Sequence, residues 1–259
     1  MRRFPSWLVP SLAFAAACSK PADKPADTPA ADTTAAMAPA PAGPQAIVTV
    51  IYKTPKDPAA FEKYYKEVHL PLVSSKQQEI GFTKAELTKF TSTLGGKKPA
   101  FYRQAELYFP SMEALQKGLK SPGMAKVSDD FKNFVAPDGL VGMIAEETGE
   151  KSDAPCPALV TVIYNAPKDS AAFESYYSET HLPLVGTGQP EIGFTRADLT
   201  RFESNLDGSA PAEYRQAELC FNSMDELKKG TATPAFKKVG DDLPRFATGG
   251  LTALIGEQQ

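Results

Sequence analysis

Apolar positions along residues 45–150 change from the spacing of a strand to that of a helix and back. Residues 47–52 are β-branched or apolar almost throughout, which is typical of a buried strand. Four side chains then recur at the i, i+3, i+4, i+7 spacing of a helical face: Phe61, Tyr64, Tyr65 and Val68. Asp57 before a proline predicts the N-cap of this helix, and Pro71 predicts that the helix stops just after His69.

The rest of the segment predicts a hairpin, a second helix and a last strand. Residues 81–90 and 100–109 have strand character, and Gly95-Gly96 joins them as a hairpin turn. Ser111 is suited to cap the second helix, and residues 140–145 form the last strand. The order βαββαβ with right-handed crossovers predicts an α+β, ferredoxin-like motif: a four-stranded antiparallel sheet with both helices on one face.

The chain contains this unit twice. A shift of 112 residues aligns residues 48–134 with 160–246 without a gap, and about 53 of the 87 aligned positions are identical. Residues 147–157 have no hydrophobic periodicity and predict a linker. We therefore expect one domain over residues 45–150 and a second over residues 151–259.

Each predicted sheet has one face that no helix covers. Strand alternation in residues 101–109 is expected to turn four side chains toward the helices: Phe101, Ala105, Leu107 and Phe109. Two such bare faces predict that the copies pack sheet to sheet and enclose a cavity. Its expected polar lining is Tyr102, Gln104 and Glu106, with their counterparts Tyr214, Gln216 and Glu218. The alternative is two separate domains whose polar faces meet water.

The N-terminal segment predicts export. Arg2 and Arg3 precede an apolar run that ends in small residues at Cys18, so residues 1–18 read as a signal peptide too short to span a membrane. The small residues before Cys18 are typical of a bacterial lipoprotein signal, in which this cysteine is lipidated; an ordinary signal peptide with a free Cys18 is the alternative. Residues 19–44 are rich in Ala, Pro, Thr and Asp and predict a disordered tether. The expected location is the bacterial cell envelope, lipid-anchored and facing the periplasm.

Charge and motifs exclude several function classes. The formal net charge is −3 and no basic stripe with interleaved aromatics is present, so nucleic acid is not an expected partner. The chain has no glycine-rich dinucleotide loop, no nucleophile elbow and no Cys or His pair at metal-ligand spacing. We therefore expect no metal site.

The two remaining cysteines lie in the second copy. Cys156 precedes its first strand and Cys220 ends its third, and these strands are antiparallel neighbours in the predicted sheet. Both cysteines should therefore lie at one edge of the sheet, where an oxidising compartment would favour a disulfide.

Motifs that both copies share resemble the EthD family. The first copy carries them at Pro55-Lys56-Asp57, Tyr64-Tyr65, His69-Leu70-Pro71-Leu72, Glu106-Leu107 and Asp129-Asp130. The resemblance covers nearly all of both copies and implies a dimeric α+β barrel, with one chain supplying both halves as an intramolecular pseudo-dimer. The wider superfamily includes cofactor-free oxygenases and haem-binding enzymes, so the resemblance implies fold more firmly than function.

The only two histidines, His69 and His181, are the first candidates for chemistry. The elements "YYKEVHLPLV" and "YYSETHLPLV" place each beside a tyrosine pair at an expected helix C-terminus, where the helix dipole favours the imidazolium form. General acid/base catalysis without a cofactor is expected from six residues: His69, His181, Tyr65, Tyr177, Glu106 and Glu218. The ligand is expected to contact six further residues: Tyr64, Tyr102, Gln104, Tyr176, Tyr214 and Gln216. Asp129-Asp130 is expected to cap a helix or to be solvated.

These residues lead to one principal function and three alternatives. We expect an envelope protein that binds a small, largely apolar or aromatic molecule, with acid/base or cofactor-free oxidoreductase chemistry. One alternative is a non-catalytic binding or accessory lipoprotein, in which each histidine is a helix stop; another is a structural protein with a filled barrel. Haem ligated by His69 or His181 is the alternative that the superfamily offers.

Overall fold

Eight antiparallel strands close into a barrel in the computed structural model, which describes residues 45–149, 152 and 154–259. The first half contributes β1 Ala46–Lys53, β2 Lys84–Thr93, β3 Phe101–Phe109 and β4 Leu140–Glu147. The second half contributes β5 Ala158–Asn165, β6 Arg196–Asn205, β7 Glu213–Phe221 and β8 Leu251–Gln258. The order around the barrel is β1-β3-β2-β8-β5-β7-β6-β4. Pairing of β2 with β8 and of β4 with β6 joins the two halves, which confirms the predicted pseudo-dimeric barrel.

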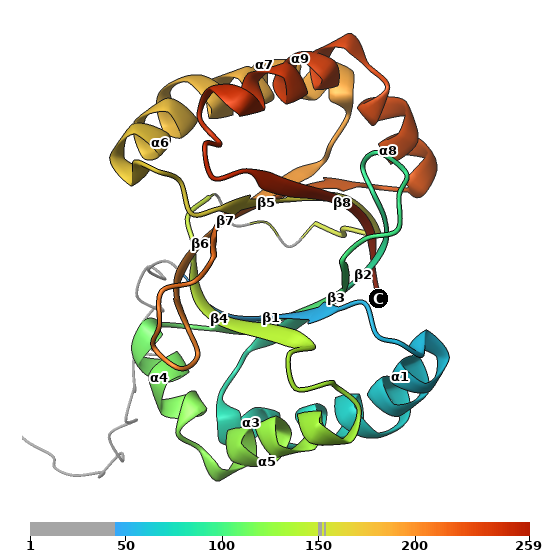
Figure 1. The fold of residues 1–259 in the computed structure, drawn as a ribbon, viewed down its shortest axis with the longest axis vertical. Helices are drawn as coiled ribbons and strands as arrows, with labels where there is room; N and C mark the ends of the chain where they lie inside the picture. Colours follow the sequence, from blue (N-terminus) through green and yellow to red (C-terminus); the bar gives the residue numbers. More distant parts are fainter. Residues whose placement is uncertain (1–44, 150–151, 153) are drawn as a thin grey trace, which may run out of the picture. The chain divides into compact units, whose positions relative to one another are not determined.

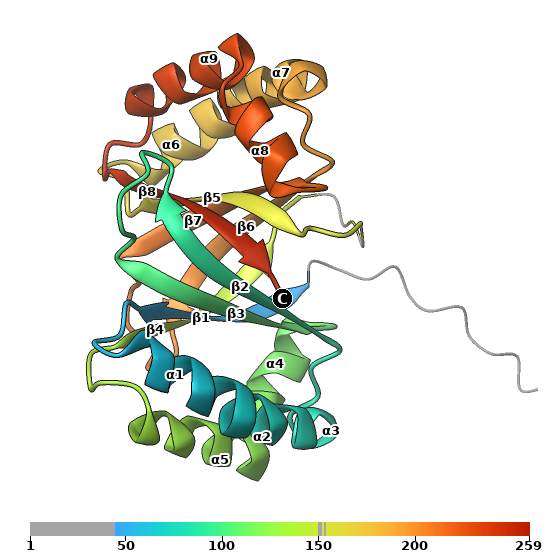
Figure 2. The ribbon, with the colours of Figure 1, turned by 90° about the vertical axis from the view of Figure 1, so that its right-hand side faces the viewer.

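The helices form two layers on opposite outer sides of the barrel (Figure 1). In the first half they are α1 Pro58–Tyr64, the π-helical turn η1 Tyr65–His69, α2 Leu70–Ser75, α3 Gln77–Ile80, α4 Met112–Leu119, α5 Pro122–Asp130 and the 3₁₀ turn η2 Phe131–Asn133. In the second half they are α6 Ser170–Tyr176, the π turn η3 Tyr177–His181, α7 Leu182–Ile192, α8 Met224–Thr231, α9 Pro234–Asp242 and the 3₁₀ turn η4 Leu243–Arg245. Figure 2 shows the strands crossing between these layers.

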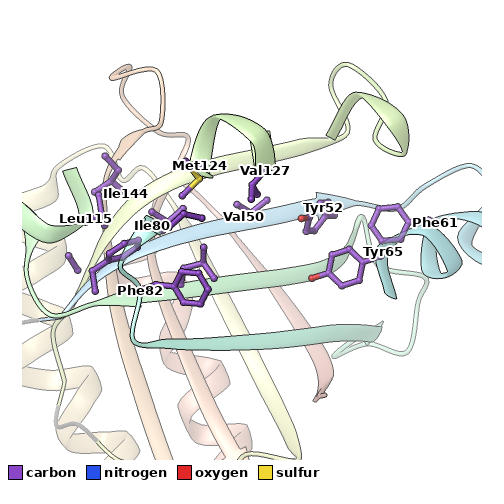
Figure 3. Packing of buried hydrophobic residues seen from close by; sticks show 14 residues of the cluster. Val50, Tyr52, Phe61, Tyr65, Ile80, Phe82, Leu115, Met124, Val127 and Ile144 are labelled. Carbon is purple, nitrogen blue, oxygen red and sulfur yellow. The ribbon is translucent and has the colours of Figure 1, made fainter. Parts of the chain in front are cut away.

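Strand β1 is buried on both faces, as its continuous apolar sequence predicts. Val48, Val50 and Tyr52 pack against the helices, whereas Ile47 and Ile51 belong to the cluster inside the barrel. Figure 3 shows the helix-facing cluster, in which β1 lies under the side chains of α1, α3, α4 and α5. The molecule thus has two helix–sheet cores and a third core in the barrel interior.

The predicted caps and hairpin are present, but one boundary was wrong. Asp57 Oδ1 accepts hydrogen bonds from the amides of Ala59 and Ala60, and Ser111 Oγ accepts one from Ala114. Strand β2 begins at Lys84 rather than at residue 81. Gly81 instead ends α3 with φ of +89°, a left-handed conformation that glycine adopts without strain.

A β-bulge overturns part of the predicted alternation in β3. The pairing with β1 skips Tyr102, because Tyr52 pairs with Arg103 and Lys53 pairs with Phe101. Tyr102 therefore lies on the helix side against Phe61, and Phe101 packs toward the barrel interior, so both predicted directions were wrong. Tyr214 is likewise on the helix side, where its ring contacts Phe173. The alternation holds beyond the bulge, since Gln104 and Glu106 face the barrel interior.

The helix also does not stop at Pro71. A π turn over Tyr65–His69 lets the Leu70 amide bond to the Tyr65 carbonyl, five residues back, and α2 continues with Pro71 in its first turn. Proline is tolerated there because the first turn of a helix does not use its amide N–H. The histidine therefore lies inside a continuous helical segment, and the predicted effect of a helix C-terminus on its charge does not apply.

The predicted disulfide between Cys156 and Cys220 is formed, with a Cα–Cα distance of 4.9 Å. Cys220 belongs to β7. This strand pairs with β5, which begins two residues after Cys156. The bridge closes a loop of 64 residues in the second half.

Several predictions fall on residues outside the described ranges. These are the signal peptide at residues 1–18 with the lipidation site Cys18, the tether at residues 19–44, and the domain boundary at residues 150–151. Among the described residues, no helix is long and apolar enough to cross a membrane.

Candidate functional site

The π turn places His69 under α5, where its ring contacts the carboxylate of Asp130. His69 Nδ1 is 2.9 Å from Asp130 Oδ2, and the imidazole is only 3% exposed. The ring lies between aromatic neighbours, with its centroid 4.8 Å from that of Phe134 and 5.6 Å from that of Tyr65. Because π turns widen a helix locally and are frequent at functional sites, the irregularity itself draws attention to this histidine.

Asp130 receives three side-chain hydrogen bonds. Besides the contact with His69, its Oδ1 accepts from the Tyr64 hydroxyl at 2.7 Å and from Asn133 Nδ2 at 3.0 Å. Burial opposes ionisation of Asp130, but the hydrogen bonds from Asn133, His69 and Tyr64 outweigh it and lower the pKa of this carboxyl. Asp130 is therefore ionised at neutral pH, and the expectation that it caps a helix or is solvated was wrong.

The histidine is neutral under the same conditions. Burial lowers the pKa of His69, and the hydrogen bond to Asp130 offsets only part of this effect. A neutral imidazole that faces a carboxylate donates its Nδ1 proton, which leaves Nε2 as the proton acceptor. Within the described part of the chain, Nε2 has no hydrogen-bond partner.

His69 lines a cavity of about 330 Å³ between the helices and the outer face of the sheet. The walls are mostly apolar and come from β1, β3, α2 and α5: Val48, Val50, Leu70, Val73, Leu107, Met124 and Val127. This volume and lining are typical of a small-ligand site. The cavity lies outside the barrel. The prediction that the His69 ring opens onto a cavity between the two sheets was therefore wrong.

Tyr65 also lines this cavity, and it carries a buried hydroxyl group. Its side chain is 1% exposed, and its hydroxyl oxygen has no hydrogen-bond partner in the described structure. Burial raises the pKa of Tyr65 to about 12, so the phenol stays protonated and can donate a hydrogen bond. In Figure 3 the hydroxyl groups of Tyr52 and Tyr65 both point away from Phe61.

An ion pair between Arg103 and Glu62 packs against the face of the Tyr65 ring that carries the guanidinium contact. The guanidinium of Arg103 lies 4.8 Å from the centre of the Tyr65 ring and donates two hydrogen bonds to Glu62, at 2.9 and 2.7 Å. Burial opposes ionisation of Glu62, but the hydrogen bonds from Arg103 outweigh it and bring the pKa of this carboxyl to about 2. The paired charges fix the aromatic ring without entering the cavity.

The second half repeats the site. His181 Nδ1 is 2.9 Å from Asp242 Oδ2, and Asp242 Oδ1 accepts from the Tyr176 hydroxyl at 2.8 Å. Burial lowers the pKa of His181 and raises that of Tyr177. The Tyr177 hydroxyl is again buried without a partner among the described residues, and Arg215 lies behind its ring. Arg245 takes the place of Asn133, with its Nε 3.6 Å from Asp242.

The structure separates the predicted site residues into two groups. His69, Tyr65 and Tyr64 lie together on the helix side, although Tyr64 turns its hydroxyl to Asp130 rather than into the cavity. Tyr102 also lies on the helix side, outside the cavity lining. Four predicted residues lie instead in the barrel interior, across the sheet: Gln104, Glu106, Gln216 and Glu218. Glu106 therefore cannot work together with His69, contrary to the prediction.

The aspartates and arginines of the site were missed from the sequence. Asp130 and Asp242 have the clearer signal, because the aspartate is kept in both copies immediately before three positions that all differ: Phe131-Lys132-Asn133 against Leu243-Pro244-Arg245. Arg103 and Arg215 have no comparable signal, since they lie in a strand that is nearly identical in the two copies.

No group of three or more His, Cys, Asp or Glu side chains able to hold a metal ion occurs among the described residues. The imidazole Nε2 atoms of His69 and His181 are the atoms that could ligate a haem iron. A carboxylate on the other ring nitrogen is a common way to orient such a ligand, so the residues present fit this role as well as that of a base.

Comparison with known proteins identifies the family. An EthD domain model matches residues 53–138 and 165–250. An uncharacterised 11.0 kDa protein of Rhodococcus erythropolis is 35% identical over 100 residues, which cover 39% of this chain and 93% of that protein. A crystal structure of an EthD family protein from Bacillus halodurans is 25% identical, covers 42% of this chain and 99% of that chain, and has a TM-score of 0.36.

A structure with both halves shares the fold. The crystal structure of an anthrone oxidase-like protein is 12% identical, covers 83% of this chain and 91% of that chain, and has a TM-score of 0.56. With both halves matched by the family model, the chain belongs to the EthD family and carries two EthD domains.

Proposed function

We propose that each half binds a small, largely apolar molecule in its helix-facing cavity and that His69 and His181 act there as general bases. One observation carries the proposal: a neutral imidazole, fixed through Nδ1 by an ionised aspartate, opens into an apolar cavity. A general base must be unprotonated, oriented and within reach of the ligand. His69 meets the first two conditions, and its place in the cavity wall supports the third.

The reaction that suits this arrangement is removal of a proton from a phenolic O–H or from a C–H next to a carbonyl. His69 Nε2 takes the proton, and the resulting imidazolium is stabilised by the Asp130 carboxylate. Negative charge then develops on the ligand oxygen, to which the unpartnered Tyr65 hydroxyl can donate a hydrogen bond. The apolar walls exclude water and strengthen both interactions.

An oxidoreductase version of this chemistry needs only dioxygen as the oxidant. The deprotonated ligand carbon would add to O₂ to give a peroxide anion, and the imidazolium proton would convert it to the hydroperoxide. No further electron donor enters this balance. The same base therefore serves isomerisation, proton exchange and cofactor-free oxygenation. These reactions differ only in whether the carbanion takes up a proton at another position, a proton from solvent, or dioxygen.

The test uses 2-tetralone, an apolar ketone with acidic C–H bonds. We expect the protein to accelerate exchange of these protons in D₂O, followed by NMR, and the H69Q/H181Q double variant to lose about 10²-fold in rate. The E67Q variant, which changes an exposed carboxylate on the same helical segment, is the matched control. Exchange by H69Q/H181Q at the wild-type rate would overturn the role of the histidines. An oxygen electrode in the same assay separates oxygenation from simple exchange.

A non-catalytic binding role is the second candidate, and the hydrogen-bond network favours it. Asp130 in α5 binds both Tyr64 and His69, so the network ties the first helical segment to the second. In this case 2-naphthol would bind, proton exchange would stay at the background rate, and H69Q/H181Q would lower Tm without affecting any turnover.

We also propose that the protein works without haem, because a base and a hydrogen-bond donor suffice for proton transfer. Haem bound through the histidine Nε2 would require that atom as an iron ligand and would remove the base. Protein purified from its own host should therefore show no Soret band. A Soret band that is lost in H69Q/H181Q would favour the haem alternative.

We further propose that Cys18 is lipidated and holds the barrel at a membrane of the bacterial envelope, facing the periplasm. The Cys156–Cys220 disulfide supports an oxidising compartment. A diacylated cysteine should make the protein partition into detergent, and the C18S variant should not. Mass spectrometry that finds mature protein with an unmodified Cys18 would contradict the proposal.

A further inference from the structure

The two cavities differ in size although equivalent positions build them. The cavity of the first half has a volume of about 330 Å³, and that of the second half about 620 Å³. Both contain the histidine, the buried tyrosine and the apolar outer face of the sheet. The second cavity also reaches Gly149, Ser152 and Ala253, which have no equivalent in the lining of the first, and the walls that the two cavities share differ at the few positions where the copies diverge.

Three of these positions are smaller in the second half. Gly186 replaces Ser74, Gly240 replaces Ser128 and Leu243 replaces Phe131, and all six residues line their cavities. Two positions change in the opposite direction, since Phe236 replaces Met124 and Arg196 replaces Lys84. The substitutions lie on α7, α9 and η4, the layer that covers the sheet, so they enlarge the roof of the second cavity.

Neither the backbone conformation nor a close neighbouring atom requires glycine at positions 186 and 240. Neither has a positive φ, and a Cβ added at either position would meet nothing within 4 Å. Glycine inside a helix is destabilising relative to alanine. Two glycines that leave open space in a cavity wall, at some cost to their helices, are what a larger ligand would require.

We propose that the two halves bind ligands of different size, and that Gly186, Gly240 and Leu243 determine the size limit of the second site. This inference rests on the proposed binding function and deepens it. The first site takes one- or two-ring apolar phenols or ketones. The second site also takes ligands of about four fused rings, because close packing in the first cavity leaves no room for them.

The test is a calorimetric titration of the whole protein with two phenols. 2-Naphthol should bind with two equivalents per chain, and the four-ring phenol 17β-oestradiol with one. The G186S/G240S variant copies the first half into the second, and both hydroxymethyl groups enter open space, so the fold should be kept. Filling a ligand pocket by one or two small groups should weaken oestradiol binding by about tenfold or more and leave two equivalents of 2-naphthol.

The reciprocal variant S74G/S128G/F131L is the matched control. It enlarges the first cavity and should raise the stoichiometry of oestradiol from one to two. Two equivalents of oestradiol on the wild type, or none, would overturn the size difference while leaving 2-naphthol binding and the proposed function intact. Failure of both phenols to bind would instead overturn the proposed function and the inference with it.

Discussion

Replacing Glu106 and Glu218 in the barrel interior should remove a large pH dependence of stability. Gln104 Nε2 donates to Glu218 Oε1, and Gln216 Nε2 donates to Glu106 Oε1, both at 3.2 Å. The Oε1 atoms of both glutamines have no donor among the described residues. A protonated carboxyl group has one O–H to donate. Two neutral carboxylic acids would thus supply the two donors that the glutamine oxygens lack.

The electrostatics of the interior favour the same protonated state. Burial raises the pKa of Glu106 to about 8, and the carboxylates of Glu86 and Asp198 add to this effect, while hydrogen bonds from Gln104 and Gln216 oppose it. Burial also raises the pKa of Glu218, and Glu106 adds to that shift. Two cations of this region pair with the neighbouring carboxylates: Arg196 pairs with Glu86 and Asp198, and Lys84 pairs with Glu86.

The sign and magnitude follow from linkage between protonation and folding. Because the folded pKa of Glu106 is raised, the stabilisation is complete below pH 4.5 and is lost as pH rises toward 8. A shift from 4.5 to about 8 corresponds to about 5 kcal/mol at 1.36 kcal/mol per unit. The free energy of unfolding should therefore fall by about 1.4 kcal/mol per pH unit between pH 5 and 8. Glu218 adds to this slope, and the pair titrates as one coupled system.

Urea unfolding followed by circular dichroism at pH 5, 6, 7 and 8 measures this slope. In the E106Q/E218Q variant the glutamine amide groups replace the carboxyl protons as donors, so the fall in stability between pH 6.5 and 8 should disappear and the variant should exceed the wild type at pH 8. Below pH 6.5 both proteins share the opposite contribution of His69 and His181, whose pKa values are lowered by burial. The E67Q variant changes an exposed carboxylate and should keep the wild-type slope. Equal slopes in the wild type and E106Q/E218Q would refute the assignment of neutral acids.

Three further substitutions test the site and the disulfide. The Y65F variant should keep or raise Tm, because the hydroxyl has no partner in the described structure. Combined with H181Q to silence the second site, it should lose about 10²-fold in proton-exchange rate relative to H181Q alone. The D130N variant, combined with H181Q to silence the second site, should lose exchange activity at pH 7. The reason is that the amide no longer fixes His69 or stabilises its imidazolium form. Activity equal to that of H181Q alone would contradict this role. The C156S variant should be less stable by about 4 kcal/mol in urea without reductant, the value for closing a loop of this length, and reductant should remove the difference from the wild type.

Burial and pairing could be predicted from the sequence wherever local and global preferences agree. The continuous apolar character of residues 47–52 gave a strand buried on both faces, and the 112-residue repeat gave a barrel with two equivalent halves. The disulfide followed from the neighbouring places of β5 and β7. These features depend on hydrophobicity and on strand order, both of which can be read from spacing alone.

The position of the cavity could not be predicted in this way. Both faces of the sheet bury residues, so strand alternation separates the side chains into two sets without showing which set encloses free space. The barrel interior is occupied by hydrogen-bonded glutamates and glutamines, whereas the space lies under the helices. Only the volumes of packed side chains decide this, and they depend on contacts between residues far apart in the chain.

Two of the errors in local structure occur where the backbone departs from regular geometry, and both lie beside the site. The β-bulge places Tyr102 next to Arg103 on the helix side, and Arg103 supports the ring of Tyr65. The π turn allows the helix to pass Pro71 and to bring Tyr65 and His69 into contact. Sequence rules describe regular elements, so they fail at such irregularities, which proteins keep mainly where function requires a particular side-chain direction. The two irregularities thus act on the same cavity residue, Tyr65, and both are repeated in the second half, which is an argument for a working site.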